Sequence, residues 1–255
     1  MTVPLTSHAT TLRSFWKQLF RYNWKFGLFL ILLFGIPRFI LVLHAQVSGS
    51  YNTAFIIFLL MCFTPLIFLT RQGRKKIGLK RPRNFLWLPA CFVAGGLCCV
   101  GVFALFGWLF SDPTHQPLNY IAGAGAVPAE ISNSDRLTYF LIASIPSMLF
   151  SPIGEELLYR GVIHGSFTGQ FGETRASVFD SLAFACTHLA HFGILYRSGH
   201  WHFLFLPAIL WVICMFVASQ VFFRCKQTAG SLYGAICSHA GFNLAMMYLI
   251  FYHPC

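Results

Sequence analysis

The sequence predicts an all-α membrane protein, a polytopic bundle of about seven transmembrane helices around a buried polar site. Two observations carry this prediction. Of the 255 residues, 56% are hydrophobic and only 10% are charged, whereas a soluble domain of this size has roughly 25% charged residues. In addition, seven stretches of the chain approach the ~20 mostly apolar residues that a membrane helix needs. No polar stretch is long enough for a second, soluble domain.

The predicted spans follow a polar N-terminal arm, residues 1–25. They run at about 26–46, 52–70, 85–110, 137–163, 178–196, 202–223 and 229–252. No small-residue cleavage site follows the first apolar run, so we interpret it as an uncleaved helix rather than a signal peptide. We therefore divide the chain into the arm, N-terminal helices and loops over 26–136, and a helical core over 137–252.

The distribution of charge predicts the orientation. The net charge is +11, but the basic residues lie in short loops beside apolar runs, as the positive-inside bias predicts, and do not indicate a nucleic-acid partner. The arm and the loop 71–83 (RQGRKKIGLKRPR) are strongly basic, whereas the opposite side receives only Arg136 and Arg197. The N-terminus is therefore expected in the cytoplasm. The acidic loop 111–136 is expected outside, as a surface connector or, less favoured, a substrate lid.

The nine cysteines show no spacing typical of a metal cluster or a disulfide framework. Most lie inside apolar runs, where free thiols behave as small hydrophobic side chains. A structural zinc cluster would need CxxC-type spacing, which the sequence lacks.

Ionisable side chains inside predicted spans are costly in a bilayer and mark candidate functional sites. The stretch SPIGEELLYRG contains Glu155, Glu156 and Arg160. Glu156 and Arg160 are four residues apart and share a helix face in the favourable order. Glu155 is rotated by about 100° from Glu156, which leaves it without an evident partner and free for chemistry. Arg38 is a further buried charge without an evident partner.

Two histidine-containing stretches are the other candidates. FACTHLAH places Phe184, His188 and the weaker candidate His191 in one span, and HAGFN places His239 and Asn243 four residues apart in the last span. We expect Asn243 to orient His239 or to donate a hydrogen bond to a developing oxyanion.

The depths of these residues predict that they meet. At 1.5 Å per residue, Glu155 lies roughly 12 Å, and His188 and His239 each roughly 15 Å, from the cytoplasmic ends of their helices. One buried site in the cytoplasmic half of the bilayer follows. Glu155 could act there as a general base on water. Alternatively Glu155, His188 and His239 could hold a divalent metal such as zinc with one position open for water. Both arrangements suit amide hydrolysis.

The three motifs, in this order, resemble the CPBP family, the CAAX prenyl proteases and bacteriocin-processing, Abi-like intramembrane proteases. The family pattern EExxxR, FxxxH, HxxxN corresponds here to EELLYR (155–160), FACTH (184–188) and HAGFN (239–243). The resemblance covers roughly 137–252 and implies a helical bundle with a conical cavity open to the cytosol. The family has been described both as glutamate-type and as metal-dependent.

The resemblance also implies roles for six residues. Glu155 and His188 would activate the water, and Glu156 and Arg160 would support the site. His239 and Asn243 would stabilise the oxyanion or help to bind a metal.

The resulting prediction is an intramembrane endopeptidase of a bacterial cytoplasmic (inner) membrane, acting on a membrane-associated protein or peptide. A non-catalytic membrane scaffold or signalling modulator on the same fold is the alternative. A proton-relay transporter is disfavoured because the sequence shows no inverted repeats.

Overall fold

The computed structural model describes residues 11–124 and 131–253, and apart from one small hairpin its regular elements are helical. The first ten residues of the predicted arm, residues 125–130 of the loop 111–136 and the last two residues of the C-terminal tail lie outside the described part. The elements are α1 (Ser14–Leu19), α2 (Trp24–Ser48), α3 (Asn52–Phe68), α4 (Arg71–Lys76), α5 (Trp87–Leu109), η2 (Pro113–His115), α6 (Pro117–Ala124), α7 (Arg136–Glu156), the π-helical η3 (Leu157–Ile163), α8 (His164–His188), β1 (Ile194–Arg197), β2 (His200–Phe203), α9 (Phe205–Ala229) and α10 (Leu232–Tyr252).

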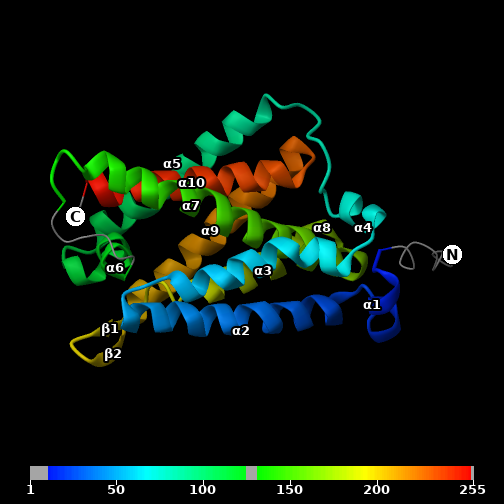
Figure 1. Cartoon of the computed structure of the whole chain (residues 1–255), viewed down its shortest axis with the longest axis horizontal. Helices are drawn as coiled ribbons and strands as arrows, with labels where there is room; N and C mark the ends of the chain where they lie inside the picture. The colour runs from blue at the N-terminus through cyan, green and yellow to red at the C-terminus, as the bar shows by residue number, and fades with distance from the viewer. Residues whose placement is uncertain (1–10, 125–130, 254–255) are drawn as a thin grey trace.

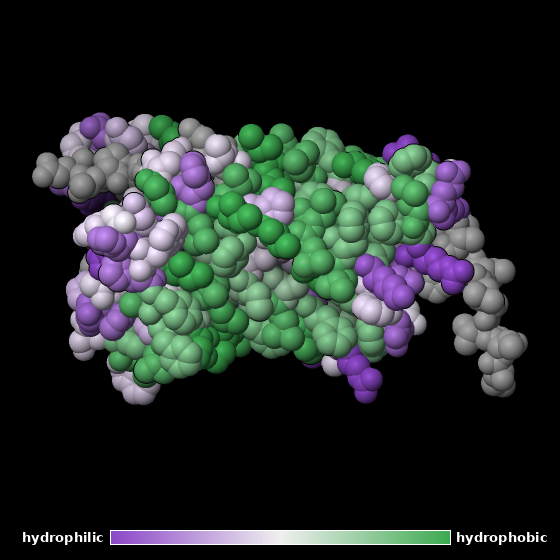
Figure 2. All heavy atoms as spheres, turned by 90° about the horizontal axis from the view of Figure 1, so that it is seen from below, coloured by the Kyte–Doolittle hydropathy of each residue, from purple (hydrophilic) through white to green (hydrophobic). Residues whose placement is uncertain are grey.

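Five helices of the described part are long and apolar enough to cross a membrane. They are Trp24–Ser48, Trp87–Leu109, Arg136–His188, Phe205–Ala229 and Leu232–Tyr252. Large apolar side chains remain exposed on them, including Leu97 (68%) and Ile142 (64%). Figure 2 shows one face of the molecule, on which apolar side chains form a broad band between two polar ends. This pattern indicates a multi-pass membrane protein, because such a surface needs lipid rather than water around it.

The segment 136–188 differs from the two separate predicted spans, 137–163 and 178–196. It forms one 53-residue run of helix, in which α7, η3 and α8 follow one another without a loop. The run is broken at Gly172, whose φ of 73° and ψ of 170° are not helical. Only glycine adopts this conformation readily, so the chain reverses there. The prediction of two crossings separated by a loop missed that the helix continues to this glycine.

A hairpin replaces the predicted ends of the fifth and sixth spans. The fifth was expected to reach residue 196, but α8 ends at His188 and the strands β1 and β2 pair antiparallel before α9 begins at Phe205. The two residues between the strands, Ser198 and Gly199, both have positive φ (50° and 82°). This is the backbone geometry of a tight hairpin turn.

The two ends of the bundle differ in charge. In Figure 1 the end with α1 and α4 lies opposite the end with α6, the hairpin and the last turn of α10. Of the 18 Lys and Arg residues, all in the described part, Arg136 and Arg197 lie at the α6 end, and Arg38 and Arg160 are buried. The others belong to segments at the α1/α4 end, which we call the basic end.

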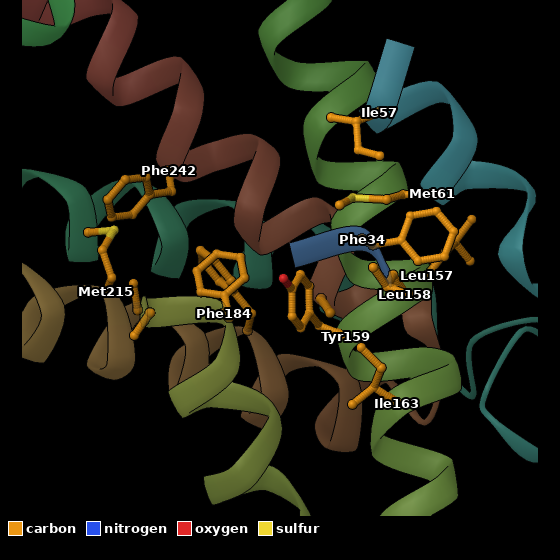
Figure 3. Packing of buried hydrophobic residues seen from close by; sticks show 14 of the residues in the cluster. Phe34, Ile57, Met61, Leu157, Leu158, Tyr159, Ile163, Phe184, Met215 and Phe242 are labelled. Atoms are coloured by element: carbon orange, nitrogen blue, oxygen red, sulfur yellow. The ribbon is translucent and has the colours of Figure 1, made fainter. Parts of the chain in front are cut away.

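The core lies where η3 meets α3 and α8. Every residue of η3 is buried, and Tyr159 packs edge-on against Phe184 with ring centroids 5.6 Å apart. Figure 3 shows Phe184 between Tyr159 on one side and Met215 and Phe242 on the other. This packing holds the segment that carries Glu155 and Glu156 against the helix that carries His188.

Helices α5 and α10 approach most closely through glycines. A Cβ at Gly95 would collide with the carbonyl oxygen of Ser238, and a Cβ at Gly241 with that of Phe92. Small residues at such positions let membrane helices pack backbone to backbone.

We expect Gly95→Val to destabilise the protein by about 1–3 kcal/mol, because the new side chain has no space and α10 must move. Gly101→Val in the same helix is the matched control, since nothing lies within 4 Å of a Cβ there. Unfolding of the two variants in detergent measures the difference. Equal stability of both variants would show that the contact between α5 and α10 does not limit stability.

Candidate active site

A cavity of about 900 Å³ lies between α2, α3, α7, α8, α9 and α10. Its walls are mostly aromatic and aliphatic, with a group of polar side chains on one side: Arg38, Ser147, Ser151, His188, His191, His239 and Asn243. Glu155 and Glu156 lie directly behind this polar wall and are fully buried. Of the six candidate residues from the three motifs, His188, His239 and Asn243 therefore line the cavity, and Glu155 and Glu156 lie behind them.

Glu155 has a partner that the sequence did not reveal. Arg38 Nε donates to Oε1 of Glu155 at 2.7 Å, and Nη2 lies 2.6 Å from the same oxygen. The expectation that Glu155 is unpaired is therefore wrong for Oε1. It holds for Oε2, which has no hydrogen-bond partner among the described residues. The guanidinium offsets the charge of the carboxylate inside the membrane and leaves one oxygen free to react.

Arg38 also organises the residues around it. Nη1 donates to the carbonyl of Thr187 at 3.1 Å, and Nη2 contacts Nε2 of His188 at 3.1 Å and Nε2 of His191 at 3.3 Å. Because Nδ1 of His188 lies 2.8 Å from the carbonyl of Phe184, Nδ1 must carry the proton and Nε2 must accept from Arg38. The imidazole of His188 is thus a neutral acceptor that holds the guanidinium in place.

Glu156 forms the second half of the cluster, and its predicted pair with Arg160 is present. Nη1 of Arg160 lies 3.1 Å from Oε1 of Glu156, and the guanidinium also contacts Ser219 and stacks 4.2 Å above Phe184. Oε1 of Glu156 in turn accepts from Nδ1 of His239 at 2.9 Å. The carboxylate orients the ring of His239, so that its Nε2 points toward Oε2 of Glu155 at 3.8 Å.

The free oxygen of Glu155 is aimed between the two histidines. Oε2 lies 3.9 Å from Nε2 of His188 and 3.8 Å from Nε2 of His239. The ring of Phe222 stacks on His239 with centroids 4.7 Å apart. This packing restricts the histidine to one orientation toward Glu155.

Asn243 differs from its predicted arrangement. Its Nδ2 donates to the carbonyl of Ser147 on α7 at 2.9 Å, and no described hydrogen bond joins it to His239. Asn243 therefore ties α10 to α7 rather than orienting the histidine. Its amide nitrogen has a second hydrogen, and the side chain lines the cavity, so the residue remains able to donate to a bound group.

The donor set does not fit the alternative of a divalent metal held by Glu155, His188 and His239. A metal bound by Glu155, His188 and His239 would need the lone pair on Nε2 of His188. Arg38 occupies that lone pair at 3.1 Å, and its positive charge opposes a divalent cation at the same place. Within residues 11–124 and 131–253, no group of three or more His, Cys, Asp and Glu side chains is arranged to hold a metal ion.

Sequence reasoning also missed the polar residues behind Arg160. Nε of Arg160 lies 3.9 Å from Oδ1 of Asp180, and Oδ2 of Asp180 lies 2.6 Å from Nδ1 of His164. Nε2 of His164 continues to the exposed Glu173 at 2.9 Å. The sequence did contain a signal for this group, because Asp180 is an acidic residue inside an apolar stretch. The group supports Arg160 from the side away from the cavity.

The apolar helices and the buried polar cavity together define a multi-pass membrane protein with an internal site. Residues 137–245 match the family model described as type II CAAX prenyl endopeptidase Rce1-like. The family resemblance predicted from the three motifs is thereby confirmed for this segment. No curated protein and no solved structure matches the chain.

Proposed function

We propose that the protein is an intramembrane endopeptidase that hydrolyses a peptide bond of a membrane-associated protein or peptide with water activated by Glu155. The observation that carries this proposal is the free Oε2 of Glu155, placed within 3.9 Å of Nε2 of His188 and of Nε2 of His239, two residues that line the cavity. A buried carboxylate held by Arg38 through its other oxygen is suited to accept a proton. The family match over 137–245 supports the same reaction class.

The steps use residues of this chain. Oε2 of Glu155 removes a proton from a water molecule. The oxygen of this water attacks the carbonyl carbon of the scissile bond at the same time. The second amide hydrogen of Asn243 donates to the resulting oxyanion. Protonated Glu155 then gives the proton to the leaving nitrogen as the C–N bond breaks, which yields a carboxyl group and an amine. Arg38 and His188 position Glu155, and Glu156 and Arg160 position His239.

We further propose a glutamate-type mechanism, a bacterial cytoplasmic membrane as the location and a cytoplasmic N-terminus. The charge asymmetry of the two ends supports this orientation. Seven crossings are compatible with the helices if the reversal at Gly172 separates two of them and if α3 counts as a span. The apolar part of α3, Phe55–Phe68, is shorter than the other candidates.

A comparison of membrane-protein termini tests the function. Cells that produce the wild type are compared with cells that produce Glu155→Gln at the same level. We expect new termini within or beside membrane segments in the wild type only. Identical termini in both strains, with full cellular function of the variant, would instead favour a non-catalytic scaffold.

Asn243→Ala is expected to lower the cleavage rate by about 10²- to 10³-fold, the usual loss of one oxyanion donor. Ser147→Ala is the matched control, since Asn243 bonds to the backbone carbonyl of Ser147, which the substitution keeps. Rates at saturating substrate separate a catalytic effect from a binding effect. Equal activity of both variants would remove Asn243 from the mechanism.

A further inference from the structure

We propose that a recess at the basic end binds the phosphate headgroup of an anionic phospholipid. The recess has a volume of about 730 Å³ and lies between the start of α1, the last turn of α3 and the start of α4. Figure 1 shows α1 and α4 at the same end of the molecule. None of its described lining residues belongs to the cavity beside Glu155. We call it the arginine recess, and it is independent of the proposed proteolytic function.

Three arginines line the arginine recess: Arg13 directly before α1, and Arg71 and Arg74 of α4. Nη1 of Arg13 donates to the carbonyl of Leu66 at 2.9 Å, and Nη1 of Arg74 donates to the carbonyl of Leu69 at 3.1 Å. These bonds hold both guanidinium groups at the recess and leave them further donors, since a guanidinium has five N–H groups. Paired N–H groups of arginine match two oxygens of a phosphate. The recess therefore presents oriented cationic donors of the kind that bind phosphate.

Capping of α3 explains only part of this charge. The last carbonyls of a helix have no partners within the helix, and here Arg13 and Trp16 donate to those of Leu66 and Ile67. The side chain of Arg71, in contrast, is exposed and makes no hydrogen bond or ion pair within the described part of the chain. Helix capping thus gives Arg13 a role in the fold but gives Arg71 none.

Carboxylates do not neutralise the arginine recess. The sequence has seven acidic residues, and none of those that the structure describes lines the recess. They are Asp112, Glu130, Asp135, Glu155, Glu156, Glu173 and Asp180. The ion pairs among the described residues involve none of Arg13, Arg71 and Arg74. Uncompensated cations that line one recess attract anions to it.

The apolar rim of the recess identifies the anion as part of a lipid. Phe15 is 63% exposed there, and Leu66 and Ile67 are 46% and 39% exposed. The last two belong to the final turn of the apolar stretch Phe55–Phe68, and Arg71 follows that stretch closely, so the recess lies where the apolar helix surface gives way to charge. Basic pockets at the ends of membrane helices bind lipid headgroups. A free phosphate ion would leave the rim in water, whereas the acyl chains of a phospholipid cover it.

Lipid binding in detergent tests the site without using protease activity. The purified protein is titrated with phosphatidylglycerol, which is anionic, and in parallel with phosphatidylcholine, which has no net charge, and native mass spectrometry counts the bound lipids. Salt at about 0.15 M limits the reach of distant charges to about 8 Å. The double variant Arg13→Gln/Arg71→Gln removes two charges of the recess. Its matched control, Lys17→Gln/Lys75→Gln, removes two exposed charges of α1 and α4 that do not line the recess.

We expect the wild type to bind phosphatidylglycerol more tightly than phosphatidylcholine. Arg13→Gln/Arg71→Gln should weaken this binding about 25-fold, because one basic side chain beside lipid phosphates contributes roughly fivefold. The lysine control should weaken it by less than about threefold, because its charges lie outside the recess. Equal weakening in both double variants would show a general effect of the basic end, and equal binding of the two lipids would show a site for acyl chains alone. Either result would overturn the proposal.

A single variant and a competing ion complete the test. Arg71→Gln alone should weaken the binding of phosphatidylglycerol about fivefold. Since the side chain of Arg71 has no described role in the fold, unchanged binding by this variant would overturn the proposal even if the double variant does not fold. Inorganic phosphate at the concentration of the lipid should not displace phosphatidylglycerol. Displacement would assign the recess to free phosphate and contradict a lipid site.

Discussion

Replacing Glu155 with glutamine is expected to eliminate measurable cleavage while the protein still inserts into the membrane. Glutamine keeps the shape of the side chain and an oxygen that can accept from Arg38, but its amide cannot take a proton from water. A positioned general base contributes about 10²- to 10⁴-fold to a rate, and here the same group also protonates the leaving nitrogen. Cleavage is measured with purified, monodisperse protein and the substrate identified from the membrane termini.

The matched control for this variant is Glu173→Gln. Glu173 is also a carboxylate, but its side chain is 67% exposed and contacts His164 on the side of Arg160 away from the cavity. Both variants lose one negative charge. Only Glu155 lies beside the proposed site of cleavage, whereas Glu173 lies away from it. Full activity of Glu155→Gln would exclude Glu155 as the base, and inactivity of both variants would point to a general effect of charge.

Replacing Arg38 with methionine is expected to lower the free energy of unfolding more than any other substitution considered for this protein. Arg38 is 1% exposed and Glu155 is fully buried, so the substitution leaves a carboxylate in the membrane interior without its cation. Removing one partner of a buried ion pair typically costs about 3–5 kcal/mol. Cleavage should fall as well, because His188 and Glu155 both lose the group that holds them. Unfolding in detergent and cleavage by the folded fraction are the measurements.

The double variant Arg38→Met/Glu155→Gln separates the two effects. It removes both charges, so we expect it to recover most of the stability while remaining inactive. The cycle of wild type, two single variants and double variant gives the coupling between the residues. Stabilities that simply add would show that Arg38 and Glu155 do not form the ion pair seen here.

The helices and the meeting of the three motifs could be predicted because both follow from local properties of the chain. Apolar runs mark helices, and residue counts along them give depth. Counting along separate helices brought Glu155, His188 and His239 to similar depths, and the structure has the facing atoms of these residues within 3.9 Å. The pair of Glu156 and Arg160 followed from helix periodicity, since the residues are four apart.

The partner of Glu155 could not be predicted because it depends on long-range packing. Arg38 lies 117 residues before Glu155 in the chain, and nothing local to α2 tells which helix covers it. The same limit applies to Asn243, whose spacing from His239 suggested a local contact although its amide reaches Ser147 on another helix. The cavity likewise depends on how the helices assemble, since its lining comes from residues far apart in the chain.

Cleavage in the presence of a metal chelator tests most directly whether Glu155 activates the water without a metal ion. Purified wild type and Glu155→Gln are incubated side by side with the identified substrate in chelator-containing buffer, and the new termini are counted by mass spectrometry. We expect the wild type to cleave at its chelator-free rate and the variant to produce no new termini. A wild type that loses activity with chelator, or a variant that keeps it, would contradict a mechanism in which Glu155, held by Arg38, activates the water.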